Sequence, residues 1–315
     1  MSDEQIKKIL ITSIGGDIAQ CIAKILTTDR ADIQIIGTDV GDRNAGEFYV
    51  NKFIKVPDAS DRQYLNAIKK IIEDESIDIF IPISEVEIRE SLSLNDKIAC
   101  KIIHAGASII NIGLDKLETY NALSKIGCDL PWTINSDTGL PNNYPCIFKS
   151  RTSSGSKSII KVFSLEEALF YKNLYQGYIF QELLMPIDQE VTCGVYRTKQ
   201  GETHVVQILR KLTQGQTSWG KIINEPSINL LCEKVAQCLD LQGSINIQLI
   251  NTEHGPKIFE INPRFSSTVL MRHLLGFRDL IWSIEELQGK LINFEQPKAG
   301  IIMHKVHDVI IQNNV

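Results

Sequence analysis

Short β-rich runs alternate with helical stretches between residues 7 and 104, and this alternation limits the fold more than any other feature. The predicted strands are 8–12, 33–37, 53–56, 78–83 and 101–104, and the predicted helices include 18–26 and 61–75. Strands that alternate with helices form parallel sheets, and strands that are apolar on both faces are covered by helices on both sides. The pattern predicts an α/β domain with a parallel sheet over residues 1–112.

After Gly113 the pattern changes to pairs of strands with few helices between them. A helix over 115–126 ends at Gly127, and Pro131 prevents its continuation. The predicted strand pairs are 146–149 with 158–163, 178–184 with 190–197, and 244–251 with 257–262, with a further strand at 204–212 and a loop at 215–220. Antiparallel sheets with inserted helices predict an α+β domain over residues 113–315.

Charge and composition exclude several classes of protein. Thirty-three basic and 38 acidic residues give a net charge of −5, so no basic field is present to attract nucleic acid. The N-terminus is acidic and no run approaches 18 apolar residues, so we expect no membrane segment and a cytoplasmic location. Seven cysteines without a CxxC pair favour reduced thiols over disulfides or structural zinc.

A glycine turn joins the first predicted strand to its helix. Gly15 and Gly16 lie where a Rossmann-like domain places its glycines, and Asp39 follows at the end of the second strand. Because the glycines are adjacent and Ala19 occupies the third glycine position, the match to GxGxxG is imperfect. Two interpretations stay open: the turn only connects strand and helix, or it binds a nicotinamide cofactor of an oxidoreductase.

Polar residues alternate with apolar ones in segments 244–251 and 257–262. If the turn between them centres on His254, Gln248 lies opposite Glu260 and Asn246 lies opposite Asn262. Amide and carboxylate oxygens gathered in this way suit Mg²⁺. The alternative is a solvated polar face on an edge hairpin.

Lys149 ends an apolar strand and is followed by a serine-rich loop over residues 150–157. Backbone N–H groups and hydroxyls in such a loop can hold phosphates, and a lysine adds a point charge. The alternative is a flexible hairpin tip. Arg264, two residues beyond Asn262, would add a planar fork for phosphate or carboxylate.

Taken together, these segments resemble the ATP-grasp superfamily, in particular the branch similar to the synthetase domains of carbamoyl-phosphate synthase. The N-terminal part resembles the pre-ATP-grasp domain through the runs 37–39, 81–83 and 84–87, and Asp115-Lys116 resembles the family's "DK" segment. The run 259–264 (FEINPR) closely resembles the most specific motif of the family. The resemblance implies a Rossmann-like pre-ATP-grasp domain (1–112) and an ATP-grasp domain with a small nucleotide and flap subdomain (about 113–183) and a metal and substrate subdomain (about 184–315).

The resemblance also implies roles for individual residues. It assigns the ATP phosphates to Lys116 and Lys149, the flap to Ser153, Ser154, Gly155 and Ser156, and the adenine hinge to Gln181, Glu182, Leu183 and Leu184. It assigns the ribose to Glu190, magnesium to Gln248, Glu260 and Asn262, and the acyl phosphate or its carboxylate to Arg210, Lys211 and Arg264. Gln248 stands where many members carry Glu, which removes one negative charge from the metal set.

The activity that the resemblance implies is an ATP-dependent carboxylate–amine or carboxylate–thiol ligase with an acyl-phosphate intermediate. It implies ATP and Mg²⁺ as cofactors, with two ions and Mn²⁺ as a substitute, and a small carboxylate and an amine as substrates. A homodimer is the default expectation from the frequency of such assemblies. The alternative is a non-catalytic ATP-binding or regulatory protein that retains the fold.

Overall fold

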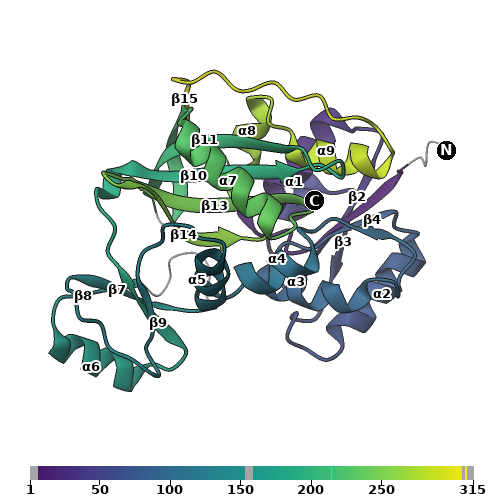
Figure 1. The fold of residues 1–315 in the computed structure, drawn as a ribbon. Helices are drawn as coiled ribbons and strands as arrows, with labels where there is room; N and C mark the ends of the chain where they lie inside the picture. Colours follow the sequence, from purple (N-terminus) through teal and green to yellow (C-terminus); the bar gives the residue numbers. More distant parts are fainter. Residues whose placement is uncertain (1–5, 153–158, 214, 307–308, 311–315) are drawn as a thin grey trace.

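The computed structural model describes residues 6–152, 159–213, 215–306 and 309–310. Within these residues the strands form a five-stranded parallel sheet (the N-terminal sheet), a six-stranded antiparallel sheet (the large sheet) and a four-stranded antiparallel sheet (the small sheet) (Figure 1). The α/β plus α+β class predicted from the sequence is confirmed. No helix in these residue ranges has the length and apolar character needed to cross a bilayer.

The N-terminal sheet has the strand order β3-β2-β1-β4-β5, with every neighbouring pair parallel. Its strands are β1 (Lys8–Ile11), β2 (Gln34–Asp39), β3 (Lys52–Lys55), β4 (Ile79–Ile81) and β5 (Lys101–Ile102). Successive side chains point to opposite faces. Leu10, Ile36 and Phe80 accordingly pack on one side, whereas Ile9 and Ile11 pack on the other. This confirms the prediction of a sheet buried on both faces.

Different parts of the chain cover these two faces. The helices and 3-10 turns of this region are α1 (Asp17–Asp29), η1 (Ala45–Tyr49), α2 (Tyr64–Glu75), α3 (Glu85–Ser91) and η2 (Leu92–Leu94). Helix α2 packs against the Leu10 face, and α1 packs against the Ile9 face. On the Ile9 face α1 is joined by α8 (Val269–Leu274) and α9 (Asp279–Leu287) from the far end of the sequence. The two predicted domains therefore share one hydrophobic cluster.

The large sheet has the order β14-β13-β10-β11-β12-β15. Its strands are β10 (Glu190–Arg197), β11 (Thr203–Thr213), β12 (Gln216–Ile223), β13 (Gly243–Thr252), β14 (Gly255–Asn262) and β15 (Ile302–His304). One face packs against α4 (Ala107–Gly113), α5 (Lys116–Lys125) and α7 (Pro226–Cys238), and α7 crosses the front of the sheet in Figure 1. Ile245, Ile247 and Leu249 face these helices, so Asn246 and Gln248 face the other way.

The small sheet projects from the rest of the molecule (Figure 1) and has the order β6-β9-β7-β8. It contains β6 (Thr133–Asn135), β7 (Cys146–Ser150), β8 (Ile159–Val162) and β9 (Tyr178–Glu182), and α6 (Leu165–Leu174) covers one face. Phe148 and Phe180 pack beneath α6 with ring centroids 4.9 Å apart. Their neighbours along the strands, such as Lys149 and Gln181, consequently face away from α6.

The structure confirms one predicted strand pair in detail and corrects another. In β13 and β14, Asn246 pairs with Asn262 and Gln248 with Glu260, as predicted, although a bulge follows Gln248. The predicted pairing of 178–184 with 190–197 is wrong: β9 pairs with β6 and β7 in the small sheet, whereas β10 pairs with β11 and β13 in the large one. The predicted loop 215–220 is also wrong, because residues 216–220 belong to β12.

A buried ion pair ties α8 and α9 to the large sheet. The guanidinium of Arg272 donates to both carboxylate oxygens of Asp279, and Ser244 on β13 donates to Asp279 Oδ2 at 2.5 Å. Both charged side chains are fully buried. A buried charge pair adds little net stability compared with apolar packing, but removing one partner leaves the other charge uncompensated.

We therefore expect Asp279→Ala to destabilise the fold by about 3–5 kcal/mol, measured from chemical denaturation followed by circular dichroism. The matched control is Asp74→Ala, which removes a carboxylate from the exposed Lys70–Asp74 pair and should change stability by less than about 1 kcal/mol. Equal effects of the two substitutions would contradict a structural role for the buried pair.

Candidate functional site

Two adjoining cavities lie on the polar face of the large sheet. The small-sheet cavity, of about 290 Å³, lies between the small sheet and β10, β11, β13 and β14. The glycine-turn cavity, of about 440 Å³, lies between β11, β12, β13 and β14 and the turn that carries Gly16. Arg210, Leu212, Gln248 and Glu260 line both cavities. A ligand in one cavity would therefore meet a ligand in the other at these side chains.

Lys149 is placed by β7 on the cavity face of the small sheet and is buried. Its Nζ donates to the Phe259 carbonyl at 3.4 Å and lies 5.4 Å from the centroid of the Phe259 ring. Burial lowers the pKa of Lys149 from 10.5 to about 8; the charge of Glu260 opposes this shift and the charge of Lys116 adds to it. A bound anion would strongly stabilise the charged form of a lysine held in this way.

Lys116 begins helix α5 and reaches the same point from the other side. Asp115 caps the helix by accepting hydrogen bonds from Leu117 N–H and Glu118 N–H. Arg151, directly after β7, donates two hydrogen bonds to the Asp115 carboxylate. This fixes the start of α5 against the end of β7, and Lys116 Nζ lies 3.7 Å from Glu260 Oε1.

The predicted metal set gathers on one hairpin. Gln248 and Glu260 pair across β13 and β14 and line both cavities, and Asn262 lines the glycine-turn cavity. Oxygen donors of this kind fit a hard divalent cation that keeps positions open for phosphate. Asn262 Oδ1 already accepts a hydrogen bond from Arg264 at 3.1 Å, so it has one remaining lone pair for a cation. Among the described residues, no group of three His, Cys, Asp or Glu side chains could hold a metal, and this set has one carboxylate.

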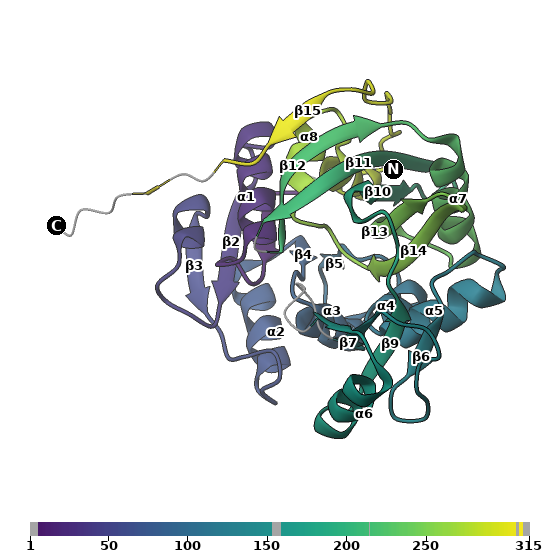
Figure 2. The same cartoon turned by 90° about the vertical axis from the view of Figure 1, so that its left-hand side faces the viewer.

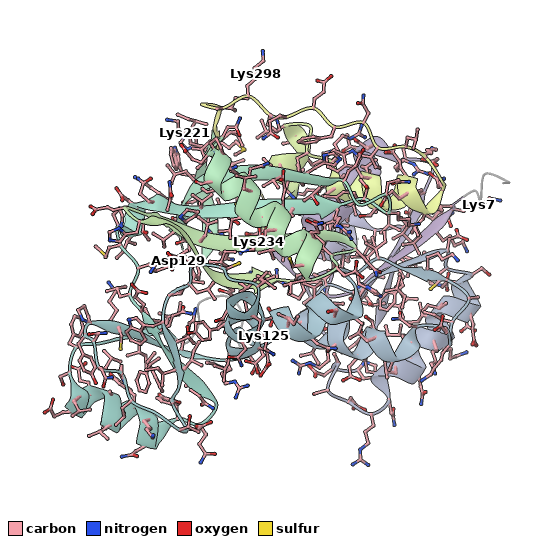
Figure 3. All side chains as sticks on the ribbon, in the orientation of Figure 1. Lys7, Lys125, Asp129, Lys221, Lys234 and Lys298 are labelled. Atoms are coloured by element: carbon pink, nitrogen blue, oxygen red, sulfur yellow. The ribbon has the colours of Figure 1, made fainter. Side chains whose placement is uncertain are left out.

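The predicted hinge and ribose residues line the small-sheet cavity. These residues are Gln181, Glu182, Leu183, Leu184 and Glu190. Glu182 Oε2 accepts a hydrogen bond from Trp132 N–H at 3.2 Å and lies 3.5 Å from Lys257 Nζ. Lys257 also lies 3.7 Å from Asp129, which Figure 3 labels on the chain between the small and large sheets.

The three predicted substrate-binding cations are not equivalent. Arg210 donates twice to Glu190 Oε1, at 2.9 and 2.5 Å, and lines both cavities. Arg264 lies 3.4 Å from Glu85 and lines the glycine-turn cavity. Lys211, next to Arg210 on β11, points to the opposite face, where its Nζ lies 5.8 Å from the Trp219 ring centroid. The structure therefore does not bring Lys211 together with the other two.

Sequence reasoning missed several side chains that line these cavities. Lys161 and Phe259 line the small-sheet cavity, and Asp17 lines the glycine-turn cavity. The alternation along β8 could have placed Lys161 on the cavity face. Ser153, Ser154, Gly155 and Ser156, the predicted flap, lie outside the described residues.

The glycine turn uses Asp39 for its own structure. Gly15 N–H donates to Asp39 Oδ2 at 2.8 Å, and a Cβ added at Gly15 would lie 3.0 Å from the same oxygen. The acid expected to bind a cofactor ribose thus holds the turn together. Gly16, Asp17 and Ser13 line the glycine-turn cavity, which opens towards the β13–β14 hairpin.

The electrostatic coupling around Lys149 can be measured. We expect Glu260→Gln to lower the pKa of Lys149 further, because it removes the negative charge that favours the ammonium form, and Lys116→Met to raise it. Titration of ¹³C-labelled lysine side chains by NMR, with Lys149→Arg to assign the signal, checks both directions. A Lys149 pKa near 10.5, unmoved by either substitution, would contradict the described geometry.

Comparison with known proteins identifies the family. Residues 114–268 match the family model for the ATP-grasp domain, whereas the curated protein sequences contain no significant match. N5-carboxyaminoimidazole ribonucleotide synthetase from Thermus thermophilus aligns with 94% of this chain and 82% of its own, at 15% identity and a TM-score of 0.75.

Two further solved structures share the fold. The biotin carboxylase domain of the 2-oxoglutarate carboxylase from Hydrogenobacter thermophilus, in complex with magnesium ADP, ADP and bicarbonate, covers 95% of this chain and 74% of its own at 16% identity (TM-score 0.75). An L-amino acid ligase from Bacillus licheniformis covers 89% and 74% at 14% identity (TM-score 0.70). Residues 114–268 therefore belong to the ATP-grasp domain family, and along most of its length the chain shares the fold of these proteins.

Proposed function

We propose that this chain is an ATP-dependent ligase that activates a small carboxylate as an acyl phosphate and joins it to an amine or thiol. The observation that carries the proposal is the junction of the two cavities. Lys116, Lys149 and Glu260 meet there, and Arg210 and Gln248 line both sides. A phosphoryl group transferred at this junction would pass directly from one cavity to the other.

The small-sheet cavity suits a nucleotide. Its apolar lining, which includes Ile147, Ile159 and Ile187, can enclose a base, and its three lysines can face a triphosphate. We assign the phosphates to Lys149 and Lys116, and the base edge to the chain that follows β9. Glu190 uses Oε1 for Arg210, so its other oxygen can accept a hydrogen bond from a ribose hydroxyl.

The β13–β14 hairpin suits the metal that accompanies ATP. We assign it to Gln248, Glu260 and Asn262; Mg²⁺, with Mn²⁺ as a substitute, would neutralise charge between the β- and γ-phosphates there. Glu260 would then exchange its contact with Lys116 for the cation. Lys116 would then face a phosphate oxygen, which keeps the charges at the junction balanced.

The glycine-turn cavity suits the carboxylate substrate. A carboxylate oxygen attacks the γ-phosphorus, and the bond to the ADP oxygen breaks. Arg264 and Arg210 can hold the carboxylate, and then the acyl phosphate, through paired N–H groups. An amine or thiol next attacks the carbonyl carbon, its proton is released, and the carbon–oxygen bond to phosphate breaks, so that phosphate leaves. Lys211, stacked on Trp219, has no direct role in these steps in the conformation described.

The similar structures are described with different acids. One is crystallised with bicarbonate and one is an L-amino acid ligase. The alternative from the sequence is a non-catalytic nucleotide-binding protein. It predicts ATP binding without ADP release, so the binding and ADP-release assays below distinguish it from a ligase.

We expect Lys149→Met and Glu260→Gln each to reduce substrate-dependent ADP release at least 100-fold, because each removes a charge at the transferred phosphate. A coupled ADP assay over a panel of carboxylates with an amine measures this. Lys221→Met is the matched control, since Lys221 is exposed on β12, next to the edge strand β15 (Figure 3). Near-normal turnover in either site variant would contradict the proposal.

Removal of divalent cations tests the hairpin separately. We expect EDTA to weaken ATP binding, measured by calorimetry, and Mg²⁺ or Mn²⁺ to restore it. The restoration should be lost in Glu260→Gln, because its carboxylate is the only one in the assigned set. ATP affinity that does not respond to EDTA would rule out the hairpin as the metal site.

A further inference from the structure

Two lysines of like charge are held close together at the small-sheet cavity. Lys149 comes from β7 and Lys116 from the start of α5, and both line this cavity. Both side chains are buried, and burial and the charge of Lys116 both lower the pKa of Lys149. Like charges repel most strongly where water is largely excluded. Contacts between the end of β7 and the start of α5 therefore have to oppose this repulsion.

The residues next to these lysines form an ion pair with each other. Arg151 follows Lys149 by two positions, and Asp115 directly precedes Lys116. Arg151 Nε donates to Asp115 Oδ1 at 3.1 Å, and its Nη2 donates to Asp115 Oδ2 at 2.6 Å. The Arg151 carbonyl also accepts a hydrogen bond from the Lys116 N–H at 3.0 Å. A guanidinium and a carboxylate joined by two parallel hydrogen bonds fix both the distance and the orientation of the segments that carry them.

This ion pair links two parts of the molecule that have separate apolar cores. Figure 2 shows, as Figure 1 does, that the small sheet and α6 lie below the large sheet. The small sheet has its own hydrophobic cluster, whereas α5 packs into the cluster of the large sheet. The contact across the cavity from Lys149 Nζ to the Phe259 carbonyl is longer, at 3.4 Å. The pair of Arg151 with Asp115 is therefore a short and directional link between the two parts.

We propose that Arg151 is a positioning residue for the polyphosphate of ATP, because its pair with Asp115 holds the two lysines together before the nucleotide binds. This inference rests on the proposed nucleotide site and adds a residue that acts through Lys116 and Lys149. Cations that are already in place need no rearrangement when the phosphates arrive, so less of the binding free energy is spent on ordering them. Without the pair, the lysines would separate, and the ligand would have to bring them together again. The loss should therefore grow with the number of phosphates on the nucleotide.

The experiment compares nucleotides that differ only in the number of phosphates. Dissociation constants of ATP, ADP and AMP are measured with Mg²⁺ by calorimetry, directly or in competition with ATP, for the wild type and for Arg151→Lys. This variant keeps the positive charge but cannot form two parallel hydrogen bonds. We expect it to weaken ATP binding about tenfold or more and AMP binding by less than about threefold.

The other outcomes separate this proposal from the proposed function. Unchanged ATP affinity in Arg151→Lys would overturn the positioning role. An equal loss for all three nucleotides would also overturn it, because a general disturbance of the fold acts in this way. A wild-type protein that does not bind ATP would instead contradict the proposed nucleotide site, and the positioning role with it.

A variant of the acidic partner distinguishes positioning from a direct effect of charge. Asp115→Asn keeps an acceptor for the helix cap but removes the carboxylate that Arg151 binds. If only charge mattered, removal of a carboxylate near the phosphates would strengthen ATP binding, whereas loss of positioning weakens it. We expect Asp115→Asn to weaken ATP binding about as much as Arg151→Lys does, and the double variant to weaken it little further. Stronger ATP binding in Asp115→Asn, or additive losses in the double variant, would refute the action of Arg151 through Asp115.

The chain offers a matched control at another two-bond pair. Arg30 donates to both carboxylate oxygens of Asp32, each at 2.9 Å, at the end of α1 that lies away from the glycine turn. We expect Arg30→Lys to leave the dissociation constants of all three nucleotides unchanged. A loss of ATP affinity in Arg30→Lys equal to that in Arg151→Lys would contradict a role specific to Arg151.

Discussion

The apolar contact of α1 with α8 and α9 determines where the glycine-turn cavity lies. Ile22 and Leu26 of α1 share one buried cluster with Val269, Leu280 and Ile281 from the C-terminal helices. Helix α1 begins at the glycine turn, and α8 follows β14 after a short connection. One apolar contact thus fixes the glycine turn opposite the end of the β13–β14 hairpin. Apolar packing alone does not fix the orientation of these helices. The buried Arg272–Asp279 ion pair, hydrogen-bonded to Ser244, does so because its hydrogen bonds are directional.

Charge balance at the cavity junction explains why a buried lysine is tolerated there. Burial disfavours the ammonium form of Lys149 and lowers its pKa to about 8, and Glu260 only partly offsets this. Lys116 and Glu260 lie 3.7 Å apart, so their opposite charges partly compensate each other. Glu190 compensates the charge of Arg210 in the same way. Keeping these cations close together therefore costs free energy in the protein without ligand. Binding of a polyanion would offset this free-energy cost.

Much of the hairpin could be predicted from the sequence, but the sheet assignments could not. Alternation with period two and a short turn fix the pairing of Gln248 with Glu260, because a slip of one residue would bury the polar face. Strands β9 and β10 are adjacent in sequence yet join different sheets, and no local pattern reports such non-local pairing. The same alternation places Arg210 and Lys211 on opposite faces of β11, although the family resemblance assigned both to the same ligand. Asp17 was missed because its ion-pair partner is Lys305, 288 residues away, and no local pattern predicts this pair.

The small sheet depends on polar contacts where it faces the large sheet. Its apolar core, with Phe148 and Phe180, is its own cluster beneath α6. Across the cavity, Lys149 contacts the Phe259 carbonyl, and Lys257 approaches Glu182. Contacts of this kind are exchanged at little cost for contacts with a charged ligand, whereas a shared apolar core is not. The nucleotide proposed to bind here would thus replace part of the polar contacts between the two sheets. Its γ-phosphate would lie at the junction with the glycine-turn cavity, which the apolar contact of α1 holds in place.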